Sequence, residues 1–111
     1  MASTIFDIID LKLIKQECFN ELIKSKNIEE QAKIAVKYNE QELLFEILET
    51  GLVFIPDISP TIIDYKNLDL LKLLIEKYSI MKNSYVVYSD IHYAKQIKDC
   101  EKIVDYLSNL N

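Results

Sequence analysis

Hydrophobic residues recur at helical intervals along most of the chain, most clearly in residues 67–78. The apolar positions of this segment cover more than the single stripe that a surface helix needs. Asn67 can accept a hydrogen bond from an amide of the first turn, while Asp69 and Lys77 match the dipole charges at the two helix ends. The pattern therefore predicts a central helix with neighbours on two sides.

Further helices are predicted before this segment. Residues 1–26 hold a short and a longer periodic stretch, which we interpret as an atypical first unit. Asn27 and Asn39 each stand three residues before a glutamate, which is the pattern of a capping box and predicts a helix start. Gly51, the one glycine in the sequence, follows the second of these helices. Because glycine adopts left-handed backbone at the least cost, we expect Gly51 to end that helix.

The connector at residues 52–60 is apolar but contains Pro56 and Pro60. Neither proline can donate a backbone hydrogen bond, and each favours extended geometry in the residue before it. This pattern predicts an ordered loop or a short extended finger. Ser59 precedes a proline, which is a good helix start, so a brief helix is expected over residues 61–66.

The next connector, residues 79–89, contains the string Y-V-V-Y at residues 85–88. Tyrosine and valine favour extended backbone, so this is the strongest strand signal in the chain. Ser89 or Asp90 is expected to cap the helix that follows, and Asp99 the last one.

The predicted helices repeat along the chain. Leu43-Leu44, Leu70-Leu71 and Ile103-Val104 occupy matching positions, at intervals of 27 and then 33 residues. Helix pairs at about this spacing are typical of a solenoid, in which each unit buries its apolar face by stacking on the next.

These helix pairs resemble the ankyrin repeat, whose first helix begins T-P-L-H-x-A and whose second reads like L-E-I-V-K-L-L-L. Residues 59–61 and 89–94 are similar to the first string, and residues 68–75 match the second closely. The resemblance implies a single all-α domain, a short solenoid of antiparallel helix pairs. In it, residues 1–26 form an atypical N-terminal cap and residues 27–111 about three ankyrin-like repeats.

Composition narrows the class of protein and its partners. With 111 residues and 50% hydrophobic content, the chain can build a core. All 13 basic residues are lysines, against 18 acids and a net charge of -5, so we expect no nucleic-acid partner. No apolar run approaches the roughly 20 residues that span a bilayer, and the N-terminus does not read as a signal peptide. We expect no membrane partner and an intracellular, cytoplasmic location, in the host cytoplasm if the chain is a viral or bacterial effector.

Residues that could carry chemistry are few. His92 is the only histidine; Ser89 and Asp90 lie near it, but no local signature supports a catalytic triad. Cys18 and Cys100 are interpreted as core thiols, with a disulfide as the alternative. Neither a zinc-ligand spacing nor a glycine-rich phosphate loop is present. We expect no catalytic residue, no metal and no cofactor, and hence no enzyme.

Tyrosines and acids at the two connectors are the candidate binding residues. Tyrosine offers a large contact area with a polar tip, and in ankyrin-like proteins the fingers and inner helices contact the partner. The leading hypothesis is a non-catalytic module that binds a partner protein, and the alternative is a self-associating structural subunit that forms a homodimer. A second interpretation of the tyrosines and Phe54 is that they cover the chain's own core. The predicted partner-binding residues are Tyr85, Tyr88, Asp90, Tyr93, Phe54 and Asp57.

Overall fold

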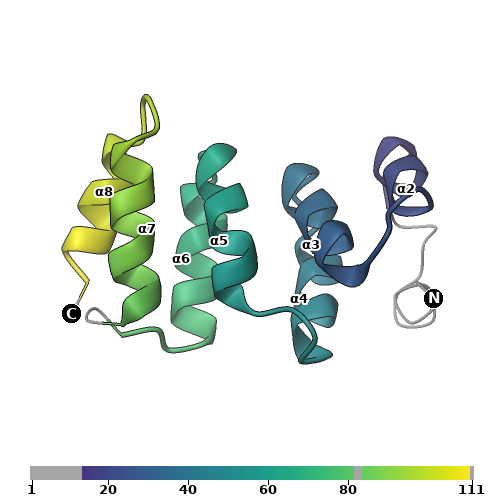
Figure 1. Cartoon of the computed structure of the whole chain (residues 1–111), viewed down its shortest axis with the longest axis horizontal. Helices are drawn as coiled ribbons and strands as arrows, with labels where there is room; N and C mark the ends of the chain where they lie inside the picture. Colours follow the sequence, from purple (N-terminus) through teal and green to yellow (C-terminus); the bar gives the residue numbers. More distant parts are fainter. Residues whose placement is uncertain (1–13, 82–83, 111) are drawn as a thin grey trace. The chain divides into compact units, whose positions relative to one another are not determined.

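The computed structural model describes residues 14–81 and 84–110, and within them it contains helices and no strand (Figure 1), which confirms the all-α class. The short first helix predicted within residues 1–13 lies outside the described residues. The chain divides into two compact units, Met1–Ile58 and Ser59–Asn111, which we take separately. The described helices are α2 (Gln16–Leu22), α3 (Ile28–Lys37), α4 (Gln41–Glu49), α5 (Ile55–Asp64), α6 (Leu68–Lys77), α7 (Tyr85–Lys95) and α8 (Glu101–Ser108).

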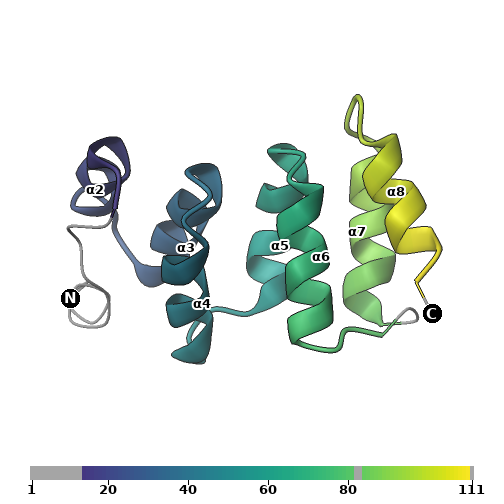
Figure 2. The same cartoon turned by 180° about the vertical axis from the view of Figure 1, so that it is seen from behind.

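In the first unit, α3 and α4 pack side by side, and α2 packs on α3 (Figure 2). The side chain of Asn27 accepts a hydrogen bond of 2.8 Å from the amide of Glu30, so this predicted helix cap is confirmed. Gly51 has a φ of 74°, as expected for the residue that ends α4. The core residues of these three helices are Cys18, Leu22, Ala32, Ile34, Ala35, Val36, Leu43, Leu44 and Ile47.

In the second unit, α6 is the central helix that the pattern predicted. Asn67 caps it by accepting from the amide of Leu70 at 3.1 Å. The ammonium group of Lys72 in α6 lies 5.3 Å from the ring centre of Tyr106 in α8, so α8 is one neighbour of α6. The buried residues of α6 are Leu70, Leu71, Leu74 and Ile75, which lie on one side of the helix, whereas Leu73 on the other side is 38% exposed.

The turns between α3 and α4 and between α5 and α6 have the same backbone geometry. Asn39 and Lys66 both have a φ of 53°, and the following residues, Glu40 and Asn67, have φ,ψ pairs of -85°,81° and -89°,77°. In each turn the left-handed residue and the one after it donate their amides to carbonyls of the preceding helix, which is the Schellman arrangement. The predicted capping box at Asn39 is therefore wrong, because Asn39 ends α3 and Glu40 takes the cap position of α4.

The prediction of a loop or extended finger at residues 52–60 is wrong, because α5 begins at Ile55. Pro56 lies in the first turn, where its missing amide would have no helical partner in any case. The carboxylate of Asp57 accepts from the amide of Phe54 at 3.0 Å and closes the helix start. Pro60 lies inside the helix and removes one helical hydrogen bond there. The brief helix predicted over residues 61–66 is the second half of α5.

The strand signal at residues 85–88 is also wrong, because Y-V-V-Y forms the first turn of α7. Ser84 caps this helix by accepting from the amide of Val87 at 3.3 Å, so Ser89 and Asp90 lie in its interior. Burial of Val87 against the rest of the unit outweighs the weak extended preference of the string. The predicted cap Asp99 instead has a φ of 62°, and Cys100 takes the cap position of α8.

Candidate functional site

Two tyrosines project from the start of α7 into solvent. Tyr85 is 83% exposed and Tyr88 is 77% exposed, so neither covers the core of its own unit. Together with Ser84, Ser89 and His92 they line an open hollow of about 520 Å³. We call the residues Tyr85, Tyr88, Ser89 and His92 the tyrosine face.

The tyrosine face follows from helix geometry. Residues three, four and seven positions apart lie on one side of a helix, so Tyr85, Tyr88 and His92 stand in one row. The core-facing side of the same helix carries Val87 and Ala94, both about 1% exposed. The opposite side of α7 therefore packs against the core, and the exposed tyrosine face does not contribute to that packing.

His92 belongs to this face, which the sequence analysis did not predict. The Nε2 atom of His92 lies 3.1 Å from the side-chain amide nitrogen of Gln96, one helical turn further on. His92 lies four residues after Tyr88, and this spacing makes the two residues neighbours only if the segment is a helix. A histidine here adds a polar tip that can donate or accept a hydrogen bond.

Asp90 does not lie on the tyrosine face. It is only 3% exposed, and its carboxylate accepts a hydrogen bond of 2.8 Å from the hydroxyl of Ser59 in α5. Burial raises the pKa of Asp90 to about 6, although the bond from Ser59 acts in the opposite direction. Asp90 therefore joins α7 to α5 inside the unit and is not placed to contact a partner.

Tyr93 also faces α5. Its hydroxyl donates a hydrogen bond of 2.6 Å to the carboxylate of Asp64, and this bond raises the pKa of Tyr93. The Tyr93 ring is half-buried. Ser59–Asp90 and Asp64–Tyr93 thus form two polar contacts between the same two helices.

Phe54 and Asp57 lie in the other unit, at the start of α5. Phe54 is 64% exposed, so it does not cover the core, and Asp57 is exposed as well. The Asp57 carboxylate is engaged in capping the helix through the amide of Phe54. Of this pair, Phe54 keeps a side chain that is free for contact.

No cluster of three or more His, Cys, Asp or Glu side chains suited to a metal ion occurs among residues 14–81 and 84–110. Cys18 and Cys100 are free and buried, as the core-thiol interpretation expected. Burial raises the pKa of the Cys18 thiol to about 11 and raises that of Cys100, so both favour the unreactive protonated form. In this same part of the chain, every helix is too short or too polar to cross a bilayer.

Comparison of the chain with protein-family models, with curated proteins and with solved structures found no match.

Proposed function

We propose that the chain is a non-catalytic, ankyrin-like module that binds a partner protein through the tyrosine face of α7. The observation that carries this proposal is the exposure of Tyr85 and Tyr88 in one row on a helix whose opposite side completes the core. Large aromatic side chains cost free energy when water surrounds them, and they are enriched among residues that dominate protein interfaces.

The ankyrin-like assignment is supported by the repeated turns. The left-handed residues Asn39 and Lys66 lie 27 residues apart, the interval that also separates Leu43 from Leu70. Each turn joins a first helix to a second whose paired leucines are buried. This agreement between backbone geometry and sequence interval is the property expected of a repeated structural unit.

The mechanism of binding is occlusion or tethering by a preformed surface. Ser84 caps α7, and contacts to α5 and α8 hold the helix in place before any partner arrives. Each tyrosine has two side-chain torsions to fix, so little conformational entropy is lost on binding. The polar tips of Tyr85, Tyr88 and His92 can then select a partner that offers matching hydrogen-bond groups.

An affinity capture from cells that express the chain tests the proposal. Wild type, Tyr85→Ala/Tyr88→Ala and the control Tyr65→Ala, another exposed tyrosine, are compared by quantitative mass spectrometry. We expect a protein that wild type and the control retain and that the double variant loses by tenfold or more. Equal retention of every captured protein by all three chains would contradict the assignment.

A further inference from the structure

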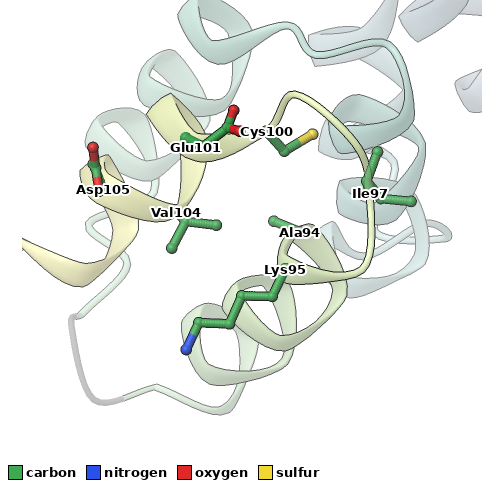
Figure 3. A pocket seen from close by; sticks show the side chains of 7 residues that line it. All are labelled: Ala94, Lys95, Ile97, Cys100, Glu101, Val104 and Asp105. Carbon is green, nitrogen blue, oxygen red and sulfur yellow. The ribbon is translucent and has the colours of Figure 1, made fainter.

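A second hollow lies between α7 and α8 and shares no residue with the tyrosine face. Its volume is about 260 Å³ (Figure 3). Ala94 and Val104 form its floor, and Ile97 and the Cys100 thiol close one end. The remaining lining residues carry charge: Lys95, Glu101 and Asp105.

The charges of this hollow are divided by sign. Lys95 projects from α7 on one side, whereas Glu101 and Asp105 project from α8 on the other (Figure 3). All three residues are exposed, and their charged groups make no ion pair or hydrogen bond with another described residue; the one side-chain bond to Asp105 comes from Asn109 and ends on its backbone carbonyl. Glu101 and Asp105 are four positions apart on one helix, so their carboxylates repel each other until a cation approaches.

A surface with an apolar centre, a cation on one side and carboxylates on the other is complementary to itself. When a two-fold axis passes through such a surface, the cation of each copy faces the carboxylates of the other, and the apolar centres meet. We propose that two copies of this chain pair through the α7–α8 hollow, with Lys95 of each copy against Glu101 and Asp105 of its partner.

This pairing is independent of the proposed function, because it uses other residues. Two copies joined at the α7–α8 hollow would present two tyrosine faces to a partner. Linking two binding sites raises the overall strength of attachment without adding a contact to either site.

Charge reversal tests the pairing with the whole chain. The Lys95→Glu chain carries three acids around the hollow, and the Glu101→Lys/Asp105→Lys chain carries three lysines. Mass in solution is measured by sedimentation over a concentration series for wild type, for each variant and for their equimolar mixture. Circular dichroism checks that these substitutions of exposed residues leave the helices intact.

We expect wild type to form a dimer, and each reversed chain alone to dimerise at least tenfold more weakly because like charges meet. The mixture should recover the dimer as a heterodimer, since the acidic hollow meets the basic one. A wild type that stays monomeric at the highest concentration would overturn the proposal, as would reversed chains that dimerise like wild type or a mixture that stays monomeric.

Tyr85→Ala/Tyr88→Ala serves as the control that separates this proposal from the proposed function. It should dimerise like wild type, because its changes lie outside the α7–α8 hollow. Loss of the dimer in this control would place the pairing on the tyrosine face and contradict the α7–α8 assignment.

Discussion

Each side of α7 carries a residue type that is unusual for its surroundings. The inner side holds an aspartate that is nearly inaccessible, whereas the outer side exposes two tyrosines. A buried carboxylate costs free energy unless it is hydrogen-bonded, and Ser59 supplies that bond. Val87 and Ala94 follow the usual pattern, so the comparison teaches that Asp90 and the two tyrosines are the exceptions in this helix, and the exposed aromatic residues call for a functional explanation.

The largest loss of stability is expected from substitution of a fully buried residue in α6. Leu74→Ala should lower the free energy of unfolding by about 2 to 5 kcal/mol, because Leu74 is fully buried and its removal leaves a cavity. Its neighbour Leu73 is 38% exposed and provides the matched control, with an expected loss below about 1 kcal/mol. Urea unfolding measures both free energies, and equal losses for the two variants would contradict the burial of Leu74 and the exposure of Leu73.

The inner side of α7 should make stability depend on pH. Folding raises the pKa of Asp90 to about 6, above the ordinary value of an unfolded aspartate. Its contribution to stability is therefore full below pH 4 and is lost as the pH rises through 6. Between pH 4 and pH 7, wild type should lose roughly 2 to 3 kcal/mol more than Asp90→Asn, which keeps an acceptor for Ser59.

Urea unfolding of both chains at several pH values from 4 to 7 checks this difference. Parallel pH profiles for wild type and Asp90→Asn would show that Asp90 is solvated, and the contrast between the two sides of α7 would then fail.

A smaller loss is expected at Tyr93, which stands between the inner and outer sides. Tyr93→Phe keeps the half-buried ring but removes the hydroxyl that donates to Asp64, so the free energy of unfolding should fall by about 1 kcal/mol. Asp64→Asn in the same assay should cost a similar amount. If the two losses are additive in the double variant, the bond between them does not form.

The smallest effect is expected on the outer side. Tyr88→Ala and Tyr85→Ala should each change the free energy of unfolding by less than about 0.5 kcal/mol, because both rings lie in solvent. Val87→Ala, one position away on the inner side, is the matched contrast and should cost about 1 kcal/mol or more. Thermal unfolding in a common buffer ranks the three variants, and a Tyr88→Ala chain less stable than Val87→Ala would reverse the orientation of α7.

The sequence predicted the parts of the fold where local signals agree. At α3 and α6 an asparagine cap, helical periodicity and a charge matching the dipole all coincide, and both helices begin where predicted. Gly51 follows α4 in left-handed backbone, which glycine adopts at the least cost.

The parts that sequence alone could not predict are those where tertiary packing outweighs local preference. Two prolines argued against a helix at residues 55–64, yet Pro56 lies in the first turn, where a proline costs least, and the helix continues through Pro60 in its interior. Y-V-V-Y read as a strand, and its helical form depends on burial of Val87.

The positions of the predicted binding residues relative to one another also depended on tertiary structure. Tyr85, Tyr88, Asp90 and Tyr93 were assigned together as finger and inner-helix residues by the ankyrin resemblance, but all four lie on one helix, which turns by 100° per residue and separates them. Only the first two share the tyrosine face, which His92 joins from the next turn. A helical assignment of residues 85–95 would have been enough to divide them.

Site-specific photo-crosslinking from the outer side of α7 tests the central claim most directly. A photoreactive phenylalanine analogue replaces Tyr88 in one chain and the exposed Tyr65 in another, and both are irradiated in cells that express the protein. The account predicts a discrete crosslinked protein from position 88 that is absent from position 65 and weakened by Tyr85→Ala. Equal crosslinking from both positions, or none from position 88 when the chain is folded, would contradict the claim that the tyrosine face binds a partner.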